Sequence, residues 1–115
     1  MNAVSVPAQP RAQLQFAVER SGRGTVVTVR GELDLAVAPD LERVLSDQPG
    51  DGVLVVDLRG LSFIDASGLR VLLRANTRAR RNGTQLHLIP GARVWRLLEL
   101  CALESRFTYA SHPPV

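Results

Sequence analysis

The sequence predicts a single α/β domain with a mixed β-sheet, in which an N-terminal hairpin is followed by parallel crossover strands packed against about three to four helices. The chain has 115 residues, a length that suits one domain with one hydrophobic core. Two strand-like segments flank a glycine-rich turn near its start, as in a hairpin. Strand-like and helix-like segments then alternate, which is typical of crossover units and of a sheet with a parallel portion.

The first two predicted strands form the hairpin. Residues 14–18 alternate apolar side chains with polar or small ones, as a half-exposed strand does. Residues 25–30 are rich in β-branched side chains, and residues 21–24 supply the turn between the two segments. Residues 1–12 contain two prolines and little pattern, so we expect them to form a flexible tail before a domain over residues 13–110.

Helices and strands alternate after the hairpin. Pro39 suits the first position of a helix, and acidic residues follow in the first turn. Residues 53–58 are a continuous apolar run, which is typical of a strand covered on both faces. The other expected elements are a helix over 67–81, a strand over 85–88, a helix with Val94, Leu97, Leu98 and Cys101 on one face, a short strand over 106–109 and a flexible tail over 111–115.

The composition argues against nucleic-acid binding. All fourteen basic residues are arginine, and the formal net charge is +3. A nucleic-acid-binding face would combine clustered arginines with aromatic side chains that stack on bases. The few aromatic residues mostly occupy positions expected in the core. We therefore favour a coding bias toward arginine and expect no direct contact with nucleic acid.

Other composition features indicate a cytoplasmic protein without a cofactor. Cys101 is the single cysteine and cannot form an internal disulfide. No run reaches the roughly 20 apolar residues of a membrane span, and the N-terminus lacks the features of a signal peptide. One cysteine and two separated histidines, His87 and His112, offer no cluster of metal ligands. We therefore expect neither a metal nor another cofactor.

The strongest functional signal lies in residues 61–69, which follow the predicted central strand and open the second helix. Parallel α/β sheets usually place their sites at the carboxyl ends of strands. Asp65 and Ser67 both have side chains that cap helices, so we expect one of them to accept hydrogen bonds from first-turn amides. Gly68 would let another molecule approach the backbone closely. On spacing alone, a capped loop without a further role is the commoner explanation.

Four segments in register carry a family resemblance. They are Gly31-Glu32-Leu33-Asp34, Val55-Val56-Asp57-Leu58, Phe63–Leu69 and Pro90–Leu100. The combination resembles the STAS domain and, more narrowly, the bacterial anti-sigma factor antagonists. The resemblance spans roughly residues 14–109 and implies the fold described above.

The resemblance also implies a phosphorylation switch. In that family, the serine before the glycine is phosphorylated by the partner, an anti-sigma factor with serine kinase activity. The unphosphorylated form binds this partner and so releases a sigma factor. The matching position is Ser67, whose phosphorylation would abolish binding, and a phosphatase acting on phospho-Ser67 would reset the switch.

The resemblance assigns further residues to the partner interface. Asp34 matches a partner-contact position, and some relatives carry a second serine where this chain has Ala66. Ser67 would therefore be the only acceptor in the loop. Together with Asp34, the expected partner-binding residues are Phe63, Asp65, Ala66, Gly68, Leu69 and Arg70.

A phosphate at this position is expected to act locally. It adds about −1.5 to −2 charges, and the free amides at a helix N-terminus tolerate such charge. The isolated domain then has no reason to rearrange. Against a bound partner, the same charge would be desolvated beside Asp65 and near Asp34.

The second helix has an arginine-rich side with two interpretations. Arg70, Arg74, Arg78 and Arg81 fall on one side of the helix, opposite apolar residues. A solvated face is the commoner explanation. The functional interpretation is a ridge that docks on an acidic partner. Arg70 is its best candidate, because a cation in the first turn gains nothing from the helix dipole.

Two other classes of function fit the sequence less well. A serine hydrolase needs a base near its nucleophile, but Ser67 lies outside a Gly-x-Ser-x-Gly elbow and His87 fits better as an exposed strand residue. We therefore expect no catalysis by this chain. The stronger rival keeps the fold but makes the chain a non-phosphorylated adaptor in a lipid-transport or stress-sensing complex.

Overall fold

Five strands form one mixed sheet in the order β2-β3-β4-β5-β6, in a computed structural model that describes residues 13–50 and 52–111. Strands β2 (Leu14–Ser21) and β3 (Gly24–Leu33) pair as an antiparallel hairpin. Strands β4 (Val53–Ile64), β5 (Gln85–Ile89) and β6 (Thr108–Tyr109) continue the sheet, each parallel to its neighbour. The predicted fold class is confirmed.

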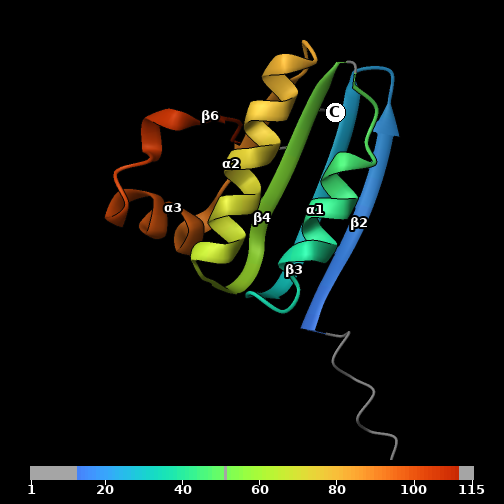
Figure 1. Cartoon of the computed structure of the whole chain (residues 1–115). Coiled ribbons are helices and arrows are strands. Elements are labelled where there is room, and N and C mark those ends of the chain that lie inside the picture. The colour runs from blue at the N-terminus through green and yellow to red at the C-terminus, as the bar shows by residue number, and fades with distance from the viewer. Residues whose placement is uncertain (1–12, 51, 112–115) are drawn as a thin grey trace, which may run out of the picture.

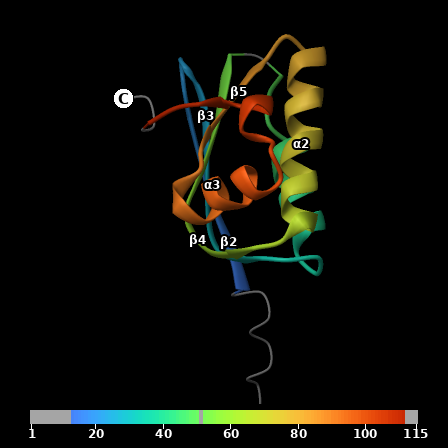
Figure 2. The same cartoon turned by 90° about the vertical axis from the view of Figure 1, so that its left-hand side faces the viewer.

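Three α-helices connect these strands. Helices α1 (Ala38–Ser46) and α2 (Ala66–Arg81) lie side by side against one face of the sheet, and α3 (Gly91–Leu100) lies on the far side of α2 from α1 (Figures 1 and 2). A short 3₁₀ helix, η2 (Glu104–Arg106), precedes β6. No helix among the described residues is both long and apolar enough to cross a membrane.

The main core lies between the sheet and the helices. Alternating residues of β3 and β4 point toward the helices, because successive strand side chains face opposite sides of a sheet. Apolar residues from every helix meet them; the completely or almost completely buried side chains are Val27, Val29, Leu33, Leu41, Val56, Leu58, Val71, Leu72, Leu88, Val94 and Leu98. The residues predicted at helical and strand spacing therefore supply most of this core.

Strand β4 is longer than its apolar run predicts. Its pairing with β3 shifts register near Arg30↔Gly60 and then continues to Leu33↔Ile64. Asp57 supports this irregularity, since its Oδ1 accepts hydrogen bonds from the Arg59 amide at 3.1 Å and from Arg59 Nε at 3.0 Å. The prediction that the strand ends near Leu58 was wrong, because polar residues in the second half still pair with β3.

The amino end of α3 lies close to Arg59, which is paired with Asp57. A second guanidinium nitrogen, Arg59 Nη2, lies 2.8 Å from Asp57 Oδ2. These side-chain hydrogen bonds from Arg59 hold the pKa of Asp57 below its ordinary value, although burial opposes them. Gly91 has a φ of +72°, and a Cβ there would stand 2.9 Å from the Arg59 Cα. Glycine is therefore required where α3 begins beside Arg59 of β4.

One predicted helix face needs a correction. Val94 and Leu98 are buried and Leu97 is half-buried, as expected for α3. Cys101 is exposed instead, because the helix ends at Leu100 and Cys101 is its C-cap. The predicted tails over residues 1–12 and 112–115, with His112, lie outside the described residues, whereas Ser111 is an exposed bend.

Candidate functional site

Two aspartates lie at the carboxyl ends of neighbouring parallel strands. Asp34 follows β3 and Asp65 follows β4, whose last residues are in register at Leu33↔Ile64. The Asp65 amide donates a hydrogen bond to the Leu33 carbonyl at 3.2 Å. This end of the sheet, at the bottom of Figure 1, therefore brings the Gly-Glu-Leu-Asp segment beside the start of α2.

Asp65 is the residue that caps α2. Its backbone is extended, with φ −118° and ψ −174°, as an N-cap requires. Its Oδ1 accepts hydrogen bonds from the Ser67 amide at 2.8 Å and from the Gly68 amide at 3.4 Å. The sequence left open which side chain caps the helix, and the structure assigns that role to Asp65.

The Ser67 hydroxyl is consequently not used for capping. Ser67 is half-buried, and its side chain makes no hydrogen bond with the rest of residues 13–50 and 52–111. It lines a groove of about 240 Å³ between α1 and α2. The other residues of this groove, which we call the Ser67 groove, are Leu35, Ala38, Pro39, Glu42, Arg70, Val71 and Arg74. The Ser67 side chain thus lies beside a groove that another molecule can enter.

Asp34 is held firmly in the loop before α1. Its Oδ1 accepts from the Ala36 amide at 3.0 Å, and its Oδ2 accepts from Gln13 Nε2 at 2.9 Å. Its carbonyl accepts from the amides of Val37 and Ala38, at 3.2 and 2.9 Å. These bonds order the segment that carries Leu35, which is 71% exposed.

Two of the expected partner-binding residues are buried. Leu69 is only 4% exposed and belongs to the core. A Cβ on Gly68 would stand 2.6 Å from both Cγ and Cδ2 of Leu33 and 3.2 Å from Cγ1 of Ile64. The glycine therefore lets Leu33 pack against the first turn of α2. The prediction that Gly68 leaves a surface open to a partner was wrong, because the core fills that space.

The other expected residues are accessible. Phe63 is 48% exposed, Ala66 and Arg70 are exposed, and Asp65 is half-buried. The surface available to a partner thus runs along the chain from Phe63 to Ser67 and across the groove to Arg70.

The arginine-rich side of α2 divides into two kinds of residue. Arg74 Nε lies 3.2 Å from Glu42 Oε1, and Arg78 Nη1 lies 3.1 Å from Glu42 Oε2. Glu42 belongs to α1, so these two arginines join the helices. Arg70 and Arg81 make no ion pair with any described residue. The predicted ridge of four arginines therefore leaves two of them available to a partner.

Asn76 of α2 has a structural role. Its Nδ2 donates to the Arg106 carbonyl at 2.8 Å and so ties α2 to the segment before β6.

His87 lies on β5 in register with Val55 of β4 and is half-buried. Ser67 follows the opposite, carboxyl end of β4, so the two residues are not brought together. Within residues 13–50 and 52–111, no three His, Cys, Asp or Glu side chains are grouped to hold a metal ion.

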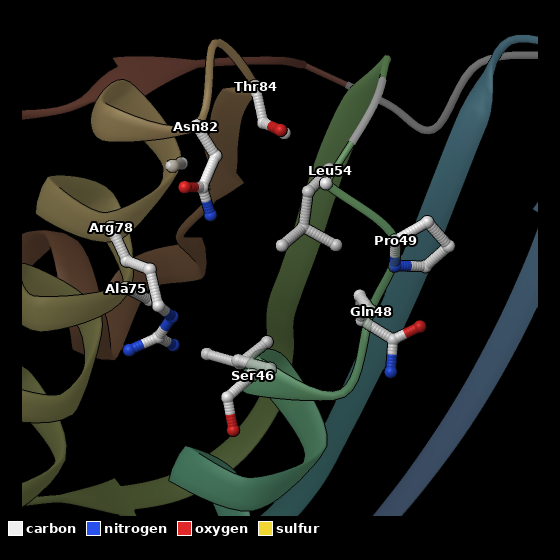
Figure 3. Close-up of a pocket in the computed structure, with 11 residues that line it drawn as sticks. Ser46, Gln48, Pro49, Leu54, Ala75, Arg78, Asn82 and Thr84 are labelled. Carbon is white, nitrogen blue, oxygen red and sulfur yellow. The ribbon is translucent and has the colours of Figure 1, made fainter.

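A separate cavity lies at the other end of α2 (Figure 3), between the C-terminal ends of α1 and α2 and the start of β4. Arg78, Asn82 and Thr84 line it, and the buried Thr84 hydroxyl has no hydrogen-bond partner. Its volume of about 50 Å³ is far below the roughly 300–1,000 Å³ of small-molecule sites. This cavity is therefore no candidate for a ligand site.

Sequence reasoning missed a second groove at the Ser67 end. It has a volume of about 200 Å³ and lies between the end of β4 and α3, lined by Phe63, Ile64, Arg93, Arg96, Leu97 and Leu100. Its four α3 residues follow an i, i+3, i+4, i+7 spacing. The sequence contains this spacing, but the buried residues of the same helix, Val94 and Leu98, have a similar helical spacing, so the pattern alone does not distinguish a second face.

Taken together, the fold and this end of the sheet define a small α/β domain with an accessible surface around a helix-capping loop and a free serine. Residues 15–113 match the family profile of the STAS domain. The anti-sigma-B factor antagonist of Staphylococcus aureus is 32% identical over 81 residues, which cover 68% of this chain and 75% of that protein. The chain therefore belongs to the STAS domain family of anti-sigma factor antagonists, which are non-enzymatic regulators.

Solved structures give the same fold. An anti-sigma factor antagonist from Mycobacterium paratuberculosis superposes with a TM-score of 0.71 at 26% identity, over 95% of this chain and 92% of that one. The unphosphorylated form of the anti-sigma factor antagonist SpoIIAA superposes with a TM-score of 0.67 at 18% identity, over 86% and 90% of the two chains.

Proposed function

We propose that this chain is a bacterial, cytoplasmic anti-sigma factor antagonist controlled at Ser67. With Ser67 unphosphorylated, the surface around the Ser67 groove binds an anti-sigma factor that has serine kinase activity, and a sigma factor is released. Phosphorylation of Ser67 abolishes this binding, and a phosphatase acting on phospho-Ser67 restores it.

The observation that carries the proposal is the division of labour between Asp65 and Ser67. Asp65 alone caps α2, with 2.8 Å between its Oδ1 and the Ser67 amide nitrogen. The Ser67 hydroxyl can therefore accept a phosphoryl group without loss of the cap. Ala66 offers no competing hydroxyl in this loop.

A phosphate at Ser67 would act mainly on the complex. In the free domain it would lie at the positive end of the α2 dipole, which favours negative charge. In the complex it would be desolvated beside the Asp65 carboxylate. Disturbing a buried charged contact at an interface commonly costs about 2–5 kcal/mol. A cost of about 3 kcal/mol lowers affinity roughly a hundredfold, which is enough to redistribute a partner between two competitors.

A second form of SpoIIAA supports a local mechanism. Its phosphorylated structure superposes on this chain with a TM-score of 0.63 at 19% identity, so that protein keeps this fold in its phosphorylated form. We expect the same of this chain.

Arg70 contributes a contact to the partner in this proposal. It lines the Ser67 groove one helical turn beyond Ser67, and it has no acidic partner among the described residues. Asp34, Phe63 and Ala66 complete the proposed contact surface, whereas Gly68 and Leu69 support it from within the core.

The test combines phosphorylation and capture. The chain is incubated with its cognate kinase and ATP, and the phosphorylated position is mapped by mass spectrometry. Wild-type, Ser67→Ala and Ser67→Asp baits are then compared for the proteins they retain. We expect phosphate on Ser67, and a kinase-like protein on the first two baits only. Modification elsewhere with Ser67 untouched contradicts the switch, and retention of a transporter ATPase favours the adaptor function.

A further inference from the structure

We infer that the Ser67 end of the molecule carries a second docking groove, which binds an apolar side chain flanked by carboxylates on the same anti-sigma factor. We call it the α3 groove. This inference rests on the proposed function and adds a second contact region, on a different helix, to the partner surface.

The α3 groove uses a face of α3 that the core leaves free. Val94 and Leu98 of this helix are completely buried against the sheet. A different stripe, Arg93, Arg96, Leu97 and Leu100, lies along the groove with Phe63 and Ile64 of β4. Residues at i, i+3, i+4 and i+7 share one face of a helix. Helix α3 therefore has one apolar stripe in the core and a second, arginine-bordered stripe facing solvent.

Exposed apolar side chains concentrate at this end of the molecule. Phe63 is 48% exposed and Leu100 is 73% exposed, and both line the α3 groove. Leu35, at 71%, lines the Ser67 groove. These are three of the five large apolar residues that are exposed among the described residues. Clustering of this kind marks interaction surfaces, whereas single exposed apolar residues are ordinary.

The charges beside both grooves point to an acidic partner. Arg93 lies in the first turn of α3, Arg70 directly follows the first turn of α2, and neither turn contains an acidic residue. A cation in a first turn, as at Arg93, is disfavoured by the helix dipole. Arg70, Arg93 and Arg96 make no ion pair with any other described residue. No ion pair among the described residues accounts for these arginines, whereas carboxylates on a partner would pair with them.

The same charges argue against a second copy as the occupant. A symmetric dimer through this groove would bring Arg93 and Arg96 toward the same residues of the other chain, and like charges placed opposite each other are repulsive. The short chain segment from Phe63 to Ser67 instead joins the two grooves. At most about 14 Å of extended chain separates these residues, so one standard protein interface can cover both grooves.

The experiment compares two double charge reversals. Arg93→Glu/Arg96→Glu changes the α3 groove, and Arg80→Glu/Arg106→Glu makes the same change in charge in a polar cavity beside β5 and β6. Each is titrated against the purified kinase-like protein that the wild-type chain retains, by surface plasmon resonance at two salt concentrations. We expect the first variant to bind at least about tenfold more weakly, with slower association at low salt. The control should bind like wild type, and both should keep the wild-type circular dichroism spectrum.

A third variant, Leu100→Ser, tests the apolar part of the groove without changing charge. Leu100 is largely exposed, so the substitution should leave the melting temperature within a degree or two and still weaken binding severalfold. Sedimentation velocity of the wild-type chain shows whether a second copy occupies the groove. A dimer that Leu100→Ser dissociates would overturn our inference.

The outcomes separate this inference from the proposed function. Wild-type affinity in both α3-groove variants, with binding lost in Ser67→Asp, overturns the groove and leaves the switch intact. Weak binding by the groove variants, with Ser67→Asp binding normally, supports the groove and contradicts the switch. If the wild-type chain retains no kinase-like protein, both proposals fail.

Discussion

The two ends of α2 use charge in opposite ways. The C-terminal end follows what helix stability favours: Arg78, Arg80 and Arg81 lie in the last turn, where the dipole attracts cations. The N-terminal end departs from it, because its first turn has no acid. Arg70, the fifth residue of the helix, follows directly after that turn.

The difference indicates which end is shaped by a partner. Arg78 at the C-terminal end and Arg74 in the middle of the helix share Glu42 of α1, so their charges are satisfied within the fold. At the N-terminal end, Arg70 has no ion pair among the described residues, and the adjacent hydroxyl of Ser67 has no hydrogen bond there. A helix selected only for stability would keep the C-terminal arginines and carry an acidic residue in its first turn. Four predictions test this contrast.

The largest effect is expected for partner binding after Ser67→Asp. A carboxylate in the first turn agrees with the helix dipole, so the melting temperature should not fall. Affinity for the kinase-like partner should drop about a hundredfold, by about 3 kcal/mol. Isothermal titration calorimetry and a thermal melt provide the two measurements. Ser105→Asp, an exposed serine beside the other end of α2, is the matched control and should bind like wild type. An acidic mimic at Ser67 that binds as tightly as the parent would contradict the switch.

The next effect concerns stability, through Gly68→Ala. Alanine normally strengthens a helix, but its Cβ would lie 2.6 Å from two carbons of Leu33, which is completely buried and cannot move aside. Overpacking of this kind typically costs about 1–3 kcal/mol. Urea denaturation should show that loss. Gly22→Ala, where a Cβ meets nothing within 4 Å, should change little.

A double-mutant cycle identifies the cause of that loss. Leu33→Val should recover part of the stability lost in Gly68→Ala, because the smaller side chain makes room for the new Cβ. Strict additivity of the two substitutions would show that Leu33 is not the obstacle.

A smaller loss is expected for Asp65→Ala. The substitution removes the acceptor for the Ser67 and Gly68 amides, and loss of an N-cap usually costs about 0.5–2 kcal/mol. Asp65→Asn should retain most of the stability, because asparagine caps helices about equally well. Chemical denaturation of both variants measures the difference. Equal losses in the two variants would mean that the negative charge, and not the cap, matters here.

The smallest effect compares Arg70→Glu with Arg81→Glu. Dipole effects on exposed charges are about 0.3–1 kcal/mol, so glutamate should slightly stabilise the N-terminal end and slightly destabilise the C-terminal end. Thermal melts at low and high salt should show opposite shifts that salt reduces. Partner binding should weaken for Arg70→Glu alone. A lower melting temperature in Arg70→Glu would assign this arginine a role in stability.

Much of this fold follows from local patterns in the sequence. The alternation over residues 14–18, the apolar run over 53–58 and the helical spacing after Ser67 all correspond to observed elements. Strand β4 extends beyond its apolar run because Asp57 and Arg59 support a shift in register. Such a shift depends on contacts between strands, which a single-sequence pattern does not contain.

The candidate site was predicted in part. Asp65 and Ser67 were identified as alternative caps, but which of the two caps the helix depends on backbone angles that only the folded loop defines. Gly68 was wrongly assigned to the surface. Its contact with Leu33 joins residues 35 positions apart, and a local sequence pattern does not reveal such a contact. The α3 groove could not be predicted from the sequence, because Phe63 and Leu100 become neighbours only when α3 packs on the sheet.

The length of β4 has a consequence for the thermodynamics of association. Beyond Asp57 this strand has no register partner on β5 and continues beside β3 alone, so it delivers Phe63 and Ile64 to the surface on hydrogen-bonded backbone. A ligand that meets an already ordered segment pays little conformational entropy to fix it. The heat capacity change on complex formation should therefore reflect the apolar area removed from water, without the excess that folding of a flexible loop would add.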